Sequence, residues 1–363
     1  MSFLRKLYRG ETRINFIGTR RRWYAASGVI VLVCVLSLIF RGFNEGVEFK
    51  GGSSFQIPAA GITSDQAQRA FTNAGAPPGE APQVVGSGSS KQIVVNTRTL
   101  QPAEQNHVVE SVAAALGIKK SDISPKTFSS RWGHDTTVKA LQGLVIFLIA
   151  VSIYMSLRFQ WRMAVGGMIA LAHDLIVAAG VYSIAGFELT PSTIVGLLTI
   201  LGFSLYDTVV VYDKVAENAK DILAGSRMTF SEAANLAVNQ TLMRSINTSL
   251  IALLPVAGLL FVGAGMLGVG TIKDLALILF VGLASGAYSS LFLATPIVVD
   301  LTERAPEYKA LTKRVVAKRS SEARKAEEAA LTGVTVAPRR STGPAPAPKV
   351  GARPAERRRR RGK

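Results

Sequence analysis

Two aspartates lie inside long apolar stretches of the chain. Asp174 falls within residues 164–185, and Asp207 falls within residues 192–212. An ionised aspartate at the centre of a membrane helix costs about 2.5 to 3.5 kcal/mol on insertion scales, so such residues usually serve a function. A carboxyl group that gains and loses a proton is suited to a proton pathway. The alternative for both residues is a structural carboxylate that bonds a neighbouring helix.

Other polar side chains accompany these aspartates. Ser204 and Thr208 flank Asp207 and predict a water-reachable carboxylate there. His173 precedes Asp174, and a lone histidine on a packed helix is more often a hydrogen-bonded partner than a proton relay. Arg244 stands at the start of a further apolar stretch. It is either a cationic anchor that reaches the lipid headgroups or an ion-pair partner of Asp207.

Gly282 and Gly286 form a G-x-x-x-G pattern in the last apolar stretch, among alanines and serines. Small residues let two membrane helices approach closely. The pattern therefore predicts a helix-packing site at these two glycines.

The elements that must position these residues are membrane helices. The chain has 363 residues, 48% of them hydrophobic, and a helix needs roughly 20 mostly apolar residues to cross a bilayer. Six stretches qualify. They are residues 25–40, 141–157, 164–185, 192–212, 245–262 and 275–299. We expect a polytopic α-helical membrane protein.

The positive charges predict the orientation of the six helices, because Lys and Arg near short loops resist translocation. Cations cluster before the first helix, between the second and third, between the fourth and fifth, and after the sixth. With six spans, all four regions fall on one side. The sequence therefore predicts that both termini are cytoplasmic in a multi-pass protein of the plasma membrane.

The segment between the first two helices is a small neutral domain with eight basic and eight acidic side chains. Strands are expected at residues 53–57, 83–86, 93–97 and 122–129, and helices at 64–74, with Ser64 as N-cap, and at 101–116. The order β-α-β-β-α-β predicts a ferredoxin-like α+β fold. Under the predicted topology this domain is extracytoplasmic.

The expected domains are a basic N-terminus at 1–24, the first transmembrane helix at 25–42, and the extracytoplasmic domain at 43–136. The remaining five helices occupy 137–301, and a basic, largely disordered tail occupies 302–363. The tail accounts for much of the net charge of +18, and a run of like charge is usually a solvated segment. With one cysteine, Cys34, no intrachain disulfide is possible. We expect no metal, no cofactor and no nucleotide-binding loop.

Several segments resemble the SecD/SecF family of protein-export proteins, in the same order as in that family. They are Gly46–Gly52 (GVEFKGG), Arg158–Arg162 (RFQWR), Ala170–Asp174 (ALAHD), Gly202–Asp213 (GFSLYDTVVVYD) and Arg244–Ser249 (RSINTS). The resemblance spans roughly residues 41–301. Phe203, Tyr206, Glu48 and Lys214 are mild departures from the family motifs, and residues 131–135 lack the usual sequence before the second helix.

The resemblance implies a resistance-nodulation-division architecture, of which six helices are one half, and a non-enzymatic role in proton-driven protein translocation. It implies that Asp207 is the intramembrane proton carrier with Arg244 as its partner, and that Asp174 belongs to the same region. It also implies partners: SecD as the second half, the SecYEG channel, SecA, the translocating preprotein and membrane lipid, with no specific nucleic acid. The alternatives are an exporter of small molecules or lipids, which the short outward domain disfavours, and a scaffold without proton transport.

Overall fold

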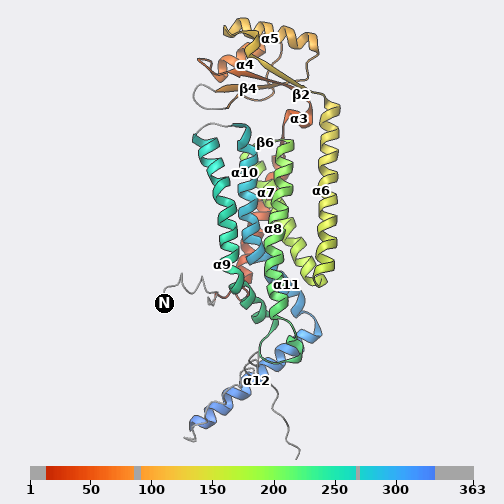
Figure 1. Cartoon of the computed structure of the whole chain (residues 1–363), viewed down its shortest axis with the longest axis vertical. Helices are drawn as coiled ribbons and strands as arrows, with labels where there is room; N and C mark the ends of the chain where they lie inside the picture. The colour runs from red at the N-terminus through yellow and green to blue at the C-terminus, as the bar shows by residue number, and fades with distance from the viewer. Residues whose placement is uncertain (1–13, 86–90, 267–269, 332–363) are drawn as a thin grey trace, which may run out of the picture. The chain divides into compact units, whose positions relative to one another are not determined.

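The computed structural model describes residues 14–85, 91–266 and 270–331. Within these ranges, six helical segments are long and apolar enough to cross a membrane, as the sequence predicts. The first five are α2 (Arg20–Phe40), α6 (Ser130–Arg158), α7 (Trp161–Ala185), α8 (Pro191–Asn218) and α9 (Phe230–Ala257). Figure 1 shows that α7, α8, α9 and α10 (Gly270–Ser289) run side by side.

The sixth span is a composite of α10 (Gly270–Ser289), a π-helical turn at Ser290–Ala294, and α11 (Thr295–Glu303). A second π-helical segment, Gly258–Met266, extends α9. A π-bulge adds a residue to one turn and is frequently found at functional sites. Here the bulge at Ser290 lies next to the two aspartates, as described below.

The spans α6 and α9 begin more than ten residues earlier than hydropathy predicts, because their first turns are polar. The helix α6 begins at Ser130, where the Ser129 side chain caps it by accepting from the Trp132 amide, so residues 130–136 are helical. The helix α9 begins at Phe230 behind a capping box of Thr229 and Glu232. A cap starts a helix whatever the hydropathy of the turn that follows.

The soluble domain lies between α2 and α6. Its strands are β2 (Gly52–Pro58), β3 (Gln83–Val85), β4 (Gln92–Thr97) and β5 (Ser124–Phe128), and its helices are α4 (Ser64–Asn73) and α5 (Pro102–Leu116), followed by the short η2 (Lys120–Asp122). The sheet is antiparallel in the order β3-β4-β2-β5. This is the predicted ferredoxin-like arrangement.

One face of this sheet carries the core of the domain. Phe55, Ile57, Ile93 and Val95 alternate inward and pack with Phe71 of α4 and with side chains of α5, and both helices lie on the same side of the sheet in Figure 1. The N-cap of α4 is Thr63, which forms a capping box with Gln66; the expected cap at Ser64 was wrong by one residue. The opposite face of the sheet carries polar side chains such as Gln56, Gln83 and Asn96 beside Val94 and Phe128.

Short elements join the domain to the membrane helices. After α2 come β1 (Asn44–Glu45) and α3 (Val47–Lys50), and β6 (Glu188–Leu189) connects α7 to α8. The strands β1 and β6 pair in parallel, so segments more than a hundred residues apart in sequence are joined at this end of the bundle.

Beyond α8 a short 3-10 turn, η3 (Ile222–Ala224), leads toward α9, and α12 (Pro306–Leu331) follows α11. Tyr308, Leu311 and Val315 of α12 pack into the core formed by the membrane helices. The chain from Val316 onward is a separate unit. Within the tail expected to be disordered at 302–363, residues 306–331 form the helix α12. Residues 332–363 lie outside the described residues, as do residues 1–13 of the basic N-terminus.

Candidate functional site

Asp174 is buried in the middle of α7 and is surrounded by hydroxyl groups. Its carboxylate accepts hydrogen bonds from Ser204 of α8 at 2.5 Å and from Ser285 and Ser289 of α10, each at 2.7 Å. His173 Nδ1 lies 3.1 Å from Asp174 Oδ1. Only 1% of Asp174 is exposed. Three helices therefore meet at this one carboxylate.

Asp207 of α8 is buried in a second, smaller hydroxyl site. It accepts from Ser245 of α9 at 2.8 Å and from Ser290 at 2.6 Å. Ser289 and Ser290 are consecutive, so one turn of the sixth span bonds both aspartates. The transition from α10 to the π-helical turn occurs between these two serines. The two carboxylates are thus connected by adjacent residues of one helix.

Glycines allow the helices to come close enough for these bonds. A Cβ atom on Gly282 would clash with the side chain of Ile200, and one on Gly286 would lie 2.9 Å from Ser204 Cβ. Because α8 and α10 touch at these two positions, the short serine side chains can reach across the interface. The serines at 285 and 289 lie on one face of α10, since residues four apart lie one above the other.

Arg244 does not pair with Asp207. It is exposed on α9, and its Nη2 donates to the Tyr206 hydroxyl at 3.0 Å. Successive residues point about 100° apart around a helix. Asp207 and Ser245 therefore form a buried pair between α8 and α9. The residues that precede them in sequence, Tyr206 and Arg244, point about 100° away and form a second, exposed pair. The ion pair with Asp207, one of the two alternatives for Arg244, is therefore not formed in this conformation.

Sequence reasoning also assigned Ser204 to the wrong aspartate and gave the serines of the last span no bonding role. Ser204 precedes Asp207 by three residues on α8, but its hydroxyl donates to Asp174. One sequence pattern could have indicated this bonding role. Ser285 and Ser289 are four residues apart in an apolar span, so they share one helix face that could bond a carboxylate of another span. His173 is buried as a partner of Asp174, and its Nε2 atom has no hydrogen-bond partner in the described structure.

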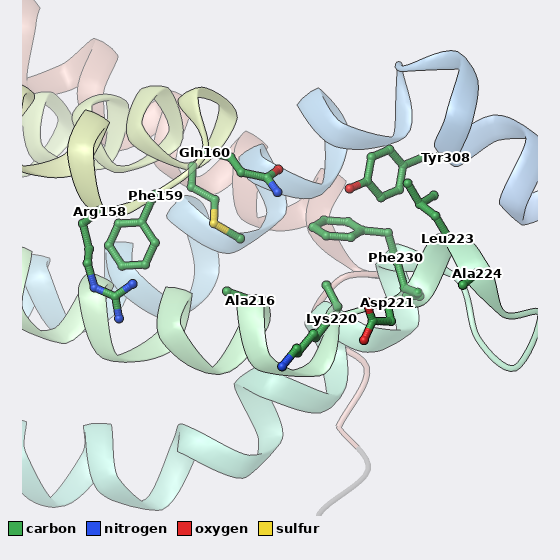
Figure 2. A pocket seen from close by; sticks show the side chains of 13 residues that line it. Arg158, Phe159, Gln160, Ala216, Lys220, Asp221, Leu223, Ala224, Phe230 and Tyr308 are labelled. Carbon is green, nitrogen blue, oxygen red and sulfur yellow. The ribbon is translucent and has the colours of Figure 1, made fainter.

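The aspartate sites are separate from a cavity of about 530 Å³ at one end of the bundle. Figure 2 shows this cavity, which has Arg158 and Lys220 on its rim and Phe159, Phe230 and Tyr308 among its apolar walls. Neither Asp174 nor Asp207 lines it. Within the described residues, no group of three or more His, Cys, Asp or Glu side chains is placed to hold a metal ion.

Comparison with known proteins agrees with these features. Residues 108–304 match the family of protein export membrane proteins SecD/SecF, C-terminal, and residues 36–60 match the SecD/SecF GG motif. The protein translocase subunit SecF of Streptomyces coelicolor is 44% identical over 324 residues, which cover 89% of this chain and 86% of that one. The SecF subunit of Mycobacterium tuberculosis is 43% identical over 327 residues, covering 88% and 74% of the two chains.

The crystal structure of SecDF from Thermus thermophilus matches with a TM-score of 0.68 and 28% sequence identity. The match covers 81% of this chain and 39% of that one, so this chain spans about two fifths of the solved protein. The fold and the site define a polytopic helical membrane protein with buried carboxylates between its spans and one α+β domain outside them. The chain belongs to the SecD/SecF family of protein export membrane proteins.

Proposed function

We propose that this translocase subunit uses the proton gradient to promote the movement of preproteins across the cytoplasmic membrane, with Asp207 and Asp174 on the proton path. The observation that carries the proposal is the surroundings of these two carboxylates. Each is at least 97% buried, and their direct partners are serine hydroxyls, with one histidine beside Asp174.

A structural carboxylate in a membrane normally has a cation beside it, because an unpaired buried charge is costly. Among the described residues, no Lys or Arg forms an ion pair with Asp174 or Asp207. A hydroxyl group donates to a carboxylate and can rotate to accept from a carboxylic acid. Each site therefore accommodates both protonation states, as a proton carrier requires.

Arg244 and Tyr206 belong to the same proposal in a second conformation. They sit one residue from Ser245 and Asp207, on the exposed side of the contact between α8 and α9. A rotation of α9 by about 100° about its axis would bring Arg244, in place of Ser245, toward Asp207. Protonation of Asp207 weakens its hydrogen bonds to Ser245 and Ser290 and so favours such a rotation. Movement of the soluble domain would accompany this rearrangement of the helices.

The orientation and the partners are also proposals. The distribution of Lys and Arg supports a topology with both termini in the cytoplasm and the soluble domain outside. The solved relative is named SecDF, and this chain covers 39% of it, so SecD is the expected second half. The SecYEG channel, SecA, the preprotein and membrane lipid are the further expected partners.

Asp207→Asn tests the proposal, because Asn preserves the volume, keeps one acceptor oxygen for one serine and offers its amide as a donor to the other, but removes the titratable proton. We expect normal assembly with SecD and loss of the gradient-dependent stimulation of preprotein transport. The measurement is transport into inverted vesicles with and without an uncoupler, together with co-purification of SecD. Glu217→Gln, which removes an exposed carboxylate from the end of the same helix, is the matched control and should transport normally.

A double variant separates a proton carrier from a structural scaffold. If Asp207 only balances the charge of Arg244, then Arg244→Gln restores assembly and activity in Asp207→Asn. If Asp207 carries protons, the double variant remains inactive. Stimulation that persists in Asp207→Asn and stays sensitive to the uncoupler would remove Asp207 from the mechanism and leave Asp174 as the candidate.

A further inference from the structure

Glu188 joins the soluble domain to the membrane helices. It lies in β6, between α7 and α8, outside the membrane-spanning segments. Its carboxylate accepts from Gln83 Nε2 at 2.9 Å and from Asn96 Nδ2 at 3.3 and 3.4 Å. Gln83 and Asn96 belong to β3 and β4, so one side chain of the membrane part bonds two strands of the domain.

The backbone around Glu188 is fixed on the membrane side. The buried Tyr182 of α7 donates its hydroxyl proton to the Glu188 carbonyl oxygen at 2.7 Å. The Gly46 amide donates to the Leu189 carbonyl oxygen at 2.9 Å, next to the pairing of β1 with β6. The carboxylate is therefore presented from a rigid support to the polar face of the sheet.

The charges that face Glu188 are mostly negative. Glu80 is hydrogen-bonded to it, and Asp274 of α10 and Glu48 of α3 are close enough to act on it. A Cβ atom on Gly46 would lie 2.7 Å from Glu48 Oε2 and 3.7 Å from Glu188 Oε2, so the two side chains share the space beside this glycine. Glu188 and Lys126 of β5 line one cavity of about 370 Å³. A second cation, Arg41, bonds the Ile184 carbonyl oxygen and lies close to Gly186.

Burial of the carboxyl, reinforced by the hydrogen bond and charge of Glu80 and by the charges of Asp274 and Glu48, raises the pKa of Glu188 to about 8. A solvated glutamate has a pKa of about 4.3. Glu188 would return to that ordinary value if the domain moved away and water reached it.

We propose that Glu188 is the positioning residue that holds the soluble domain against the membrane helices through Gln83 and Asn96, and that binding of a proton by Glu188 favours this docked position. When Glu188 binds a proton in the docked position, it loses its charge repulsion with the neighbouring carboxylates of Glu80, Asp274 and Glu48. This inference rests on the proposed function for its role in transport, but docking is measured independently of transport.

The direction of the pH effect follows from linkage. The docked state binds a proton more tightly than the undocked state, so docking is strongest below about pH 4.3 and weakens as the pH rises toward about 8. Within that window the ratio of docked to undocked protein falls by up to about tenfold per pH unit, and above it the ratio levels off. An acidic outer compartment therefore favours docking.

Distance measurement by pulsed electron paramagnetic resonance tests the proposal. Spin labels are placed at Ser121→Cys in the soluble domain and Thr199→Cys on α8, in a full-length Cys34→Ser protein assembled with SecD in lipid nanodiscs. We expect one narrow distance distribution at about pH 5, near the lower end of the window, and a broader or longer one at about pH 9, above its upper end. Glu188→Gln, which is permanently neutral, should keep the narrow distribution at both pH values.

Glu110→Gln is the matched control, because it neutralises an exposed carboxylate on α5 of the same domain, and it should respond to pH as the wild type does. A Glu188→Gln protein that retains the wild-type pH response, or a wild-type distance that does not change with pH, would overturn the proposal. Asp207→Asn should keep the pH response of the distance. A failure of Asp207 as proton carrier is thus distinguishable from a failure of the Glu188 contact.

Discussion

Asp174 and Asp207 differ in how many donors depend on them. Asp174 accepts from three serine hydroxyls and contacts His173, whereas Asp207 accepts from two serine hydroxyls. A residue that satisfies many buried donors is harder to remove without loss of stability. Asp174 therefore contributes more to the stability of the bundle than Asp207 does. Proton uptake by Asp207 disturbs fewer hydrogen bonds than proton uptake by Asp174 would.

This difference predicts a stability effect at Asp174. In Asp174→Leu the three serine hydroxyls and the His173 ring lose their common acceptor inside the bundle, and we expect a loss of about 1 to 3 kcal/mol. Asp174→Asn keeps an acceptor oxygen and should lose much less. Thermal unfolding of the purified protein in detergent measures both. Equal unfolding midpoints for the two variants would show that the serines find other acceptors.

The contact between α8 and α10 is the element that brings the carboxylates and serines together. Gly282 faces Ile200 with no room for a side chain, whereas Gly202, on α8, has no other atom within 4 Å of where its Cβ would lie. The two glycines therefore serve different purposes, although both lie in apolar helices. Only the first is required by packing.

Substitution of these glycines by alanine should have opposite effects. Gly282→Ala forces α8 and α10 apart, and overpacking of this kind costs on the order of 1 to 3 kcal/mol. Gly202→Ala meets open space and gains helix propensity, so it should be neutral or slightly stabilising. Ile200→Ala combined with Gly282→Ala should recover part of the loss. The same unfolding measurement checks all three, and a destabilising Gly202→Ala together with a harmless Gly282→Ala would contradict the packing argument.

At the scale of the whole molecule, the bundle leaves large apolar surfaces uncovered. Side chains such as Val29, Leu32, Ile146, Ile251 and Leu254 on α2, α6 and α9 are more than half exposed or nearly so. Lipid and a second half of the transporter are the surroundings that suit such surfaces. The exposed pair of Arg244 and Tyr206 joins α8 and α9.

The orientation is testable with single cysteines. In a Cys34→Ser protein, Ser121→Cys should react with a membrane-impermeant maleimide added outside intact cells, because the soluble domain is predicted to be extracytoplasmic. Lys220→Cys, in the turn after α8, is the control from the other side and should react only in inverted vesicles. Reaction of Ser121→Cys from the inside alone would reverse the predicted topology.

The sequence by itself determined the features that depend on local patterns. Six apolar stretches predict six spans because the bilayer sets their length, and the alternation of strands and helices between residues 43 and 136 predicts the ferredoxin-like domain because periodicity is local. The presence of Asp174 and Asp207 within spans is equally local. For the same reason hydropathy missed the polar first turns of α6 and α9, where a cap and not an apolar run starts the helix.

Only the tertiary structure decided which side chains meet. Asp174 bonds Ser285 across 111 residues of sequence, and Glu188 bonds Asn96 across 92. Such pairs depend on how each helix is rotated about its axis. A rotation of about 100° separates Ser245 from Arg244 and decides which of them faces Asp207. That rotation is set by the packing of whole helix faces, including the close approach at Gly282 and Gly286, and no short stretch of sequence contains it.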